Sequence, residues 1–234
     1  MEVSRVFLKK VKLTVHVLSV FALILLIFPA SSISREAAPQ EVIRAAIDGL
    51  RPFLEAIPGQ DLEHYGFASP EELARATLGK PFKVYTITPD KILNYSQEMK
   101  LSTVISPTNL WFFPVVYRGK ARTILTVDFV NGEWRAVAIG SSGLAKQLER
   151  IENKWPESDG YDHRFIRIYQ AQSDFVAVSK ERILKIVPLE SAAVALKLKK
   201  VIEGVYGLYS PSEMIPKLVP VVRENLQSQT KSVD

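Results

Sequence analysis

The sequence predicts an α+β domain in which an antiparallel β-meander, centred on residues 110–140, packs with N-terminal and C-terminal helices. Three observations predict it. Residues 110–140 alternate apolar runs with two tight-turn signals, and the second of these, Asn131-Gly132, is the dipeptide most typical of a two-residue hairpin loop. Apolar residues at helical spacing flank this stretch on both sides. The composition, 47% hydrophobic and 24% charged, is that of a chain that folds around a core.

The first 32 residues have the pattern of a secretory signal peptide. Four basic side chains and one acidic one precede an apolar run over residues 13–28, and small residues follow it. Cleavage is expected near Ser32 or Ser34. The alternative is an uncleaved helix that anchors the protein in the cytoplasmic membrane, although such a helix needs about 20 apolar residues. In both cases the sequence predicts a domain that is secreted or periplasmic, or anchored and facing outward.

The charge and the residue types exclude several functions. The net charge is +5, of which residues 1–32 hold +3, so the remainder of the chain carries only +2. This balance does not indicate a nucleic-acid partner, which requires a basic patch. The chain has no Cys and only three His, far apart in sequence, so we expect no disulfide, no metal site and no cofactor. An exported chain without Cys favours a bacterial source.

A single domain is expected over residues 35–228, and it begins with helices. Apolar residues repeat at helical spacing after Pro39, and Pro58-Gly59 ends that segment. Ser69-Pro70-Glu71-Glu72 is a capping box that starts a second helix, which Gly79 is expected to end. Residues 82–88 are then predicted to form a strand, and residues 89–109 a short helix or loop that finishes in a turn cluster at 106–109.

The meander can be given a register from its turns. A two-residue loop at Asn131-Gly132 pairs Phe129 with Trp134, Asp128 with Arg135, Val127 with Ala136 and Leu125 with Ala138. A turn at Gly119-Lys120 pairs Val116 with Thr123 and Phe112 with Val127. The predicted core face is then Phe112, Pro114, Val116, Leu125, Val127, Phe129, Trp134, Ala136 and Ala138. Because Pro114 has no backbone donor, its strand is expected at an edge or beside a bulge.

The rest of the chain predicts a helix, a hairpin and a further helical end. The predicted elements are a helix at 143–155, a polar loop at 157–163, strands near 164–171, 174–179 and 183–187, a helix at 190–203, and a segment starting at Ser210 that Pro216 and Pro220 divide into short pieces. This order of elements is similar to that of the cystatin-like and sensor-like α+β folds. The resemblance lies in element order and transfers no residues.

Motifs for catalysis are weak. Gly140-Ser141-Ser142-Gly143 has no second glycine where a serine-nucleophile elbow needs it, so a helix cap is the simpler interpretation. The loop Asp159–His163 is interpreted as a solvated acidic turn rather than a metal loop. No phosphate-binding glycine motif is present. The sequence therefore favours a protein that is not an enzyme, and carboxylate acid–base chemistry in a secreted hydrolase is the alternative.

The second face of the meander supplies the predicted binding site. An exported non-enzymatic domain of this kind is expected to bind a ligand, or an envelope protein or peptide, in a groove with aromatic walls and charged groups at its mouth. The candidate residues are Trp111, Phe113, Tyr117, Arg122, Asp128 and Arg135. In the competing reading, helices 40–57 and 70–78 cover this face, and Trp111 and Phe113 are ordinary core. The strand edge beside Pro114 is a second expected docking place, and a membrane-anchored structural envelope protein is a further alternative.

Overall fold

The computed structural model describes residues 36–181, 183–198 and 206–231. The chain divides into two units, Met1–Ser32 and Ile33–Asp234, and all described residues belong to the second. The expected signal peptide or anchor lies outside the described residues. Among the helices of the described residues, none is long and apolar enough to cross a membrane.

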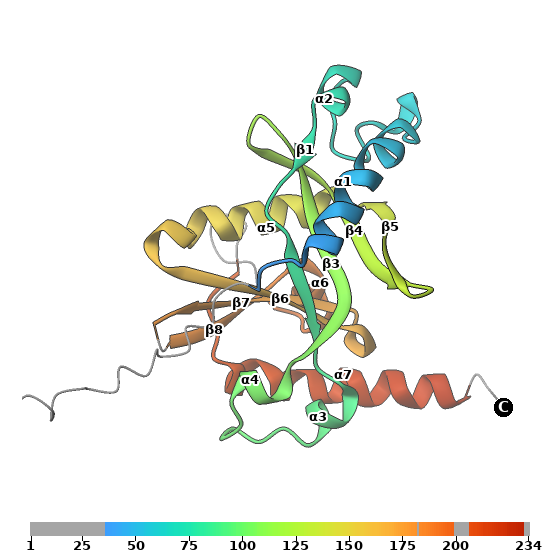
Figure 1. The fold of residues 1–234 in the computed structure, drawn as a ribbon. Helices are drawn as coiled ribbons and strands as arrows, with labels where there is room; N and C mark the ends of the chain where they lie inside the picture. The colour runs from blue at the N-terminus through green and yellow to red at the C-terminus, as the bar shows by residue number, and fades with distance from the viewer. Residues whose placement is uncertain (1–35, 182, 199–205, 232–234) are drawn as a thin grey trace, which may run out of the picture. The chain divides into compact units, whose positions relative to one another are not determined.

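The second unit is built on one eight-stranded, mostly antiparallel sheet, which confirms the predicted α+β class (Figure 1). The strand order is β5-β4-β3-β2-β6-β7-β8, and β1 also pairs with β3. The strands are β1 (Thr77–Leu78), β2 (Phe82–Thr86), β3 (Ser106–Tyr117), β4 (Lys120–Val130), β5 (Glu133–Gly140), β6 (Tyr161–Ile168), β7 (Ser173–Lys180) and β8 (Ile183–Pro188). The pair β2–β6 is parallel, and it joins the predicted meander to the second group of strands.

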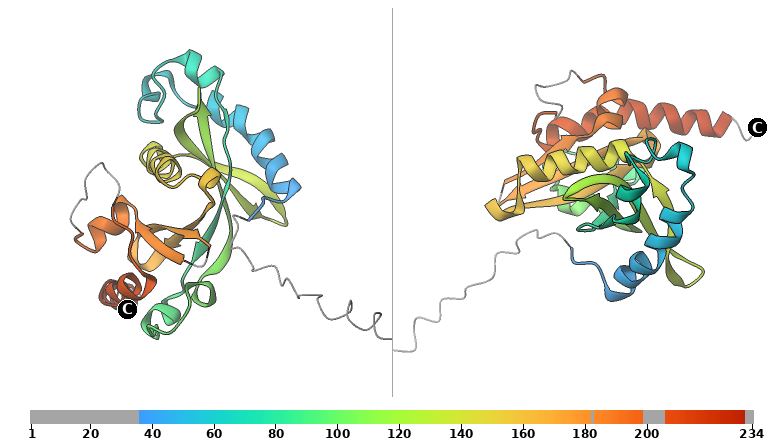
Figure 2. Two further views of the ribbon diagram at one scale, coloured as in Figure 1. Left: turned by 90° about the vertical axis from the view of Figure 1, so that its left-hand side faces the viewer. Right: turned by 90° about the horizontal axis from the view of Figure 1, so that it is seen from above.

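Helices cover both faces of this sheet (Figure 2). The helices are α1 (Gln40–Glu55), α2 (Pro70–Ala74), α3 (Pro89–Leu93), α4 (Leu101–Val104), α5 (Ser142–Lys154), α6 (Glu190–Ala195) and α7 (Pro211–Lys231). One face packs against α5 around Phe112 and Phe165. On the other face, α1 covers the meander around Trp111, and α7 covers the second group of strands around Ile166. The strands that are apolar on both faces are therefore covered by helices on both faces.

The predicted register of the meander is correct near the turn and wrong beyond two bulges. Phe129 pairs with Trp134 and Asp128 with Arg135, as predicted. Beyond Val127 the register shifts, so that Leu125 pairs with Ile139 instead of Ala138. A second shift near Val116 pairs Val127 with Trp111 instead of Phe112. Each bulge inserts one residue and exchanges the faces of the residues that follow it, so Trp111, Phe113 and Val115 belong to the core under α1.

Pro114 lies in an internal strand, since β3 has β4 on one side and β1 and β2 on the other. The Pro114 carbonyl accepts a hydrogen bond of 2.7 Å from the backbone N–H of Gly79. The N and C=O of one strand residue point to the same side, so the missing donor of Pro114 faces the interruption between β1 and β2. The expectation of an edge strand is wrong, and that of a nearby bulge is confirmed at Val115/Val116.

Several predicted boundaries need correction. The helix that starts at Ser69 ends at Ala74, because the chain then forms β1 before reaching Gly79. The turn cluster at 106–109 is the first part of β3, and residues 161–163 of the predicted polar loop belong to β6. The helix predicted at 190–203 ends at Ala195, and its predicted last turns at 199–203 lie outside the described residues.

The C-terminal segment is one helix and not short pieces, although Pro216 and Pro220 lie inside α7. Each proline removes one backbone donor, but the helix has a strong start. Ser210 Oγ accepts from the backbone N–H of Glu213 at 3.2 Å, and the Glu213 carboxylate accepts from that of Ser210 at 2.7 Å. Four side chains of the helix, Met214, Ile215, Leu218 and Val222, are buried against the sheet, and this packing outweighs the lost hydrogen bonds.

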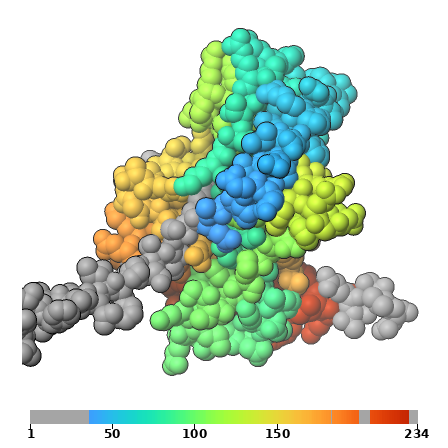
Figure 3. Space-filling view, in the orientation of Figure 1, coloured from blue at the N-terminus to red at the C-terminus, as the bar shows by residue number. Residues whose placement is uncertain are grey.

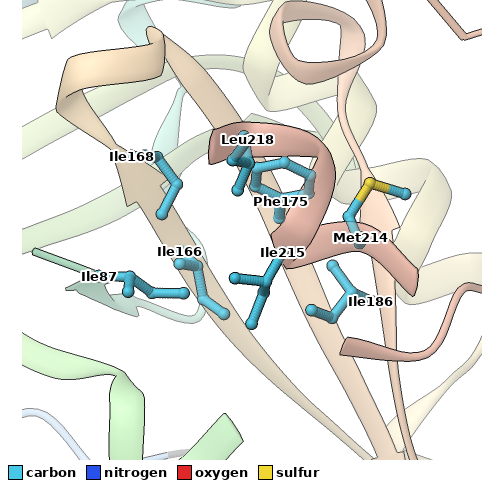
Figure 4. A pocket seen from close by; sticks show the side chains of 8 residues that line it. All are labelled: Ile87, Ile166, Ile168, Phe175, Ile186, Met214, Ile215 and Leu218. Carbon is cyan, nitrogen blue, oxygen red and sulfur yellow. The ribbon is translucent and has the colours of Figure 1, made fainter. Parts of the chain in front are cut away.

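A cavity of about 10 Å³ lies between α7 and strands β6–β8. Figure 4 shows its lining, which is entirely apolar and includes Phe175, Met214 and Leu218. A space of this size holds at most one water molecule, and an apolar lining gives such a water no partner. It is a packing void in the core and not a ligand pocket.

Candidate functional site

The six predicted site residues fall in three different places. Trp111 and Phe113 are 0% and 2% exposed, packed under α1. The groove expected above them is therefore filled by α1, and the competing reading, in which the helices cover this face, describes these two residues correctly. The physical reason is the bulge between β3 and β4 at Val115/Val116, which places Trp111 and Phe113 on the same face as Leu125 and Val127, under α1.

Tyr117 and Arg122 lie together at the far end of β3 and β4. The Arg122 guanidinium lies 5.8 Å from the centre of the Tyr117 ring, and its Nη2 donates to the Glu72 carboxylate at 2.8 Å. The same carboxylate accepts from the backbone N–H of Ala68 at 2.9 Å. Arg122 therefore stabilises the packing of α2 on the sheet, which is a structural role.

Asp128 and Arg135 are paired across the β4–β5 hairpin in backbone register, but their side chains have other partners. Arg135 forms its ion pair with Glu133, and Asp128 Oδ1 accepts from the backbone N–H of Phe129 at 2.7 Å. Asp128 is six residues from Arg122 along β4, which is about 20 Å in an extended strand. The structure therefore does not unite the six residues in one site.

A groove of about 740 Å³ lies beside this hairpin, between β4–β5 and the N-terminal half of α1. On the face drawn in Figure 3, α1 (blue) and the hairpin (yellow-green) border one another. The groove is lined by Gln40, Glu41, Arg44, Ala45 and Asp48 from α1 and by Phe129, Gly132, Glu133 and Trp134 from the hairpin. Its volume falls in the range of small-molecule and peptide side-chain pockets.

The two walls of this groove differ in chemistry. On the hairpin wall, the rings of Phe129 and Trp134 are 5.2 Å apart, and Phe129 is 43% exposed. On the helix wall, Glu41 and Asp48 are seven residues apart, which places them on one side of α1 two turns from each other. Both carboxylates are exposed, and neither forms an ion pair with any described residue.

A second group of polar and aromatic side chains adjoins the groove on the sheet face between α1 and α7. We call it the Lys83 cluster, and it consists of Lys83 and Tyr85 from β2, Trp111 from β3 and Arg164 from β6. Lys83 is directly opposite Trp111 in the β2–β3 pairing, and its ammonium lies 4.7 Å from the centre of the Trp111 ring and 5.8 Å from that of Trp134. Trp134 therefore belongs to the lining of the groove and also contacts the cluster.

Tyr85 joins this cluster to the segment that precedes α1. Its hydroxyl donates to the Glu36 carboxylate at 2.6 Å, and the Arg164 guanidinium lies 5.4 Å from the centre of its ring. Burial, followed by the hydrogen bond and negative charge of Glu36, raises the pKa of Tyr85 to about 12. Burial also lowers the pKa of Lys83, and the Glu36 carboxylate opposes that shift.

The cluster holds more hydrogen-bond donors than acceptors. Among the described residues, Trp111 Nε1 and Arg164 Nε are buried and have no hydrogen-bond partner, and Lys83 forms no hydrogen bond or ion pair. Buried donors are nearly always paired in folded proteins, because an unpaired one costs about 1–3 kcal/mol. The cluster therefore has the electrostatics of a site for a group rich in acceptor oxygens.

The residues of the Lys83 cluster other than Trp111 were not among the site residues predicted from the sequence. One local signal was present, since Lys83 and Tyr85 alternate with Phe82 and Val84 in a short strand and so share a face. Nothing in the sequence indicated that Arg164 or Glu36 would meet them, because β2 and β6 are neighbours only through a parallel pairing of residues about 80 positions apart.

The residues considered for catalysis lie at the start of α5 and inside β6. Ser141 precedes α5 with φ of 63° and makes no side-chain cap, and Ser142 Oγ donates to the His64 carbonyl at 2.9 Å. His163 is buried in β6, 1% exposed. Across the described ranges, no group of three or more His, Asp or Glu side chains is arranged to hold a metal ion.

Comparison of the chain with protein-family models, with curated proteins and with solved structures gives no match.

Proposed function

We propose that the protein is an exported binding module of the bacterial envelope, and that it holds a basic segment of a peptide or protein in the groove between α1 and the β4–β5 hairpin. Export is supported by the signal-peptide pattern of residues 1–32. Binding is supported by the groove, whose volume and mixed aromatic and polar lining fit a side chain of a partner.

The choice of a basic partner depends on one observation, which is that an aromatic wall of the groove faces a wall with two carboxylates. The exposed ring of Phe129 and the half-buried ring of Trp134 line the groove opposite the helix side that bears Glu41 and Asp48. A Lys or Arg side chain is attracted to the face of an aromatic ring by about 0.5–1 kcal/mol at exposed sites, and a carboxylate within reach of its head adds an ion pair. Arg44 also lines the helix wall, which thus carries two carboxylates and one guanidinium. This excess of negative charge, opposite an aromatic wall, favours a cationic side chain over a neutral or acidic one.

The groove is held in shape by close packing behind it. Gly49 lies against Ala136 with no room for a β-carbon, and the buried side of α1, at Val42, Ala46 and Leu50, packs on the meander. A helix fixed this closely keeps Glu41 and Asp48 at a constant distance from the hairpin. Such preorganisation lowers the entropic cost of binding.

The experiment compares two fluorescein-labelled nine-residue peptides, one in which Lys alternates with Ser and one in which Glu replaces every Lys. Fluorescence anisotropy with the purified protein is expected to detect binding of the Lys peptide only. Phe129→Ala and Asp48→Asn are each expected to weaken that binding at least fivefold.

The matched controls are Val137→Ala, which removes an exposed apolar side chain of β5 outside the groove, and Glu55→Gln, which removes an exposed carboxylate at the other end of α1. Both are expected to bind the Lys peptide as the wild-type protein does. Equal binding of the Glu peptide, no binding of the Lys peptide, or unchanged binding by Phe129→Ala and Asp48→Asn would overturn the proposal.

A further inference from the structure

The Lys83 cluster has a position that suits a ligand. Lys83 and Tyr85 lie on β2, with Trp111 on one side and Arg164 on the other. The apolar cluster under α1 ends near Trp111, and the one under α7 begins at Tyr85. The polar residues thus lie in the interval between two helices that cover the same sheet face, and in Figure 1 the segment leading into α1 crosses this part of the sheet.

The cluster is built to hold negative charge. Its donors are a lysine ammonium, an arginine guanidinium, an indole N–H and a phenol hydroxyl. Of these, the indole belongs to a fully buried Trp111, and its N–H finds no acceptor in the part of the chain that the structure describes. Arg164 Nε is also buried and has no acceptor in the same part of the chain. Such donors are satisfied by acceptor oxygens, and the acceptor oxygens of an anion form the stronger, charge-assisted hydrogen bonds.

One carboxylate already occupies part of this cluster. Glu36 is an exposed residue, yet its carboxylate oxygen accepts the Tyr85 hydroxyl at 2.6 Å, and its charge acts on Lys83. A long, exposed side chain that reaches in from the chain's own N-terminal segment resembles a ligand more than a core residue. It shows that a carboxylate carried on an extended segment can reach Tyr85.

We propose that the Lys83 cluster is a binding site for carboxylate groups, and that Glu36 is its internal occupant, which competes with carboxylates of a partner. This site goes beyond the proposed groove for basic side chains and stands on different residues. A tethered group acts at an effective concentration in the millimolar range, so Glu36 is expected to mask the affinity for free carboxylates in the wild-type protein.

The test titrates the protein with propionate, which has the chemistry of a glutamate side chain, and with propionamide as its neutral match. The indole N–H resonance of Trp111, assigned with Trp111→Phe, reports binding by NMR. The Glu36→Gln variant is expected to bind propionate at least threefold more tightly than the wild-type protein. Adding Lys83→Met to Glu36→Gln is expected to abolish the propionate-dependent shift.

Two peptide probes then separate the sources of the carboxylate, one with a single internal Glu and blocked ends and one with a free C-terminal carboxylate only. Tighter binding of either peptide by Glu36→Gln than by the wild-type protein supports the proposal. The peptide that binds more tightly shows whether the site takes a Glu side chain or a C-terminal carboxylate. Glu55→Gln is the matched control and is expected to bind as wild type does. Equal shifts with propionamide, no gain in Glu36→Gln, or a shift that survives Lys83→Met would overturn the proposal.

The outcome is distinguishable from that of the groove test. Phe129→Ala is expected to lose the Lys peptide and to keep propionate binding, whereas Lys83→Met is expected to show the reverse. Thermal unfolding of each variant identifies a loss of binding that comes from loss of the fold, and Tyr85→Phe provides a smaller change at the same site. The double variant Glu36→Gln/Tyr85→Phe is expected to bind propionate more weakly than Glu36→Gln alone, because Tyr85→Phe removes one donor to the carboxylate.

Discussion

Gly49 of α1 lies directly against Ala136 of β5, with no space between them for a β-carbon on residue 49. This contact sets the distance between the helix and the strand that form the two walls of the groove. A glycine inside a helix costs up to about 1 kcal/mol relative to alanine, so its presence here has a packing cause.

Gly49→Ala is therefore expected to destabilise the protein by about 1–3 kcal/mol, as overpacking of a core does, in spite of the better helix propensity of alanine. Chemical denaturation measures the change. The matched control is Gly143→Ala in α5, where a β-carbon meets no atom within 4 Å, and it is expected to be neutral or stabilising. Equal stability of the two variants would mean that α1 does not pack as described.

The two tryptophans of the meander are expected to differ in their contribution to stability. Trp111 is fully buried, so Trp111→Ala should lower the free energy of unfolding by about 3–5 kcal/mol. Trp134 is half-buried at the groove, and Trp134→Ala should cost about 1–2 kcal/mol, in proportion to the smaller area removed from water. Urea titrations of both variants test the ranking, which the opposite order would contradict.

The start of α7 is expected to show a defined acid dependence. The Ser210 hydroxyl and backbone donate to Glu213, and these hydrogen bonds lower the pKa of the Glu213 carboxyl. A depressed pKa in the folded state stabilises the protein above the ordinary pKa of glutamate, and this stabilisation is lost as the pH falls through the folded-state pKa.

Ser210→Ala should thus cost about 1 kcal/mol at neutral pH, and the difference from wild type should shrink below pH 4. The control is Ser228→Ala, whose hydroxyl donates to the Glu224 carbonyl within the same helix and is not part of the capping box. Thermal unfolding from pH 3 to pH 7 gives both values. If the stability lost in Ser210→Ala is the same at every pH, Ser210 does not act through the Glu213 carboxylate.

Tyr85 is expected to make stability depend on alkaline pH. Its pKa is raised to about 12 by burial and by Glu36, against about 10 in an unfolded chain. The folded state holds this proton more tightly, so the stabilisation is complete below pH 10 and is lost as the pH rises from about 10 to about 12.

Burial also raises the pKa of Tyr95 and Tyr169, so absorbance at 295 nm should show several late-ionising tyrosines in the wild-type protein and one fewer in Tyr85→Phe. Glu36→Gln should lower the pKa of Tyr85, because the hydrogen bond and the charge of Glu36 both raise it. An unchanged late step in Glu36→Gln would show that Glu36 does not contact Tyr85 in solution.

The sequence predicted the elements well wherever the signal was local. The Asn131-Gly132 turn, the two capping boxes and the apolar stripe of the helix after Ser141 all depend on residues within a few positions of each other. The bulges at Thr126/Val127 and Val115/Val116 carried no such signal. A register counted from a turn holds only up to the first bulge, which is why the faces of Trp111 and Phe113 were predicted incorrectly.

The site was harder to predict than the fold. Phe129 and Trp134 were assigned to the core face. Both line the groove beside the N-terminal half of α1, where Phe129 is exposed and Trp134 is half-buried. The Lys83 cluster depends on the position of β6 next to β2 and on the path of the segment before α1. These are properties of topology, and no spacing of residue types within the chain encodes them.

The parallel junction between β2 and β6 also has a consequence for the order of folding. The meander β3–β5 and the hairpin pairs β6–β8 each form from neighbouring strands, whereas Val84 and Phe165 must meet across a long intervening chain. Closing such a loop is slow relative to forming hairpins. The two groups of strands are thus expected to behave as separate cooperative units, with the amides of this seam exchanging with deuterium before those inside either unit.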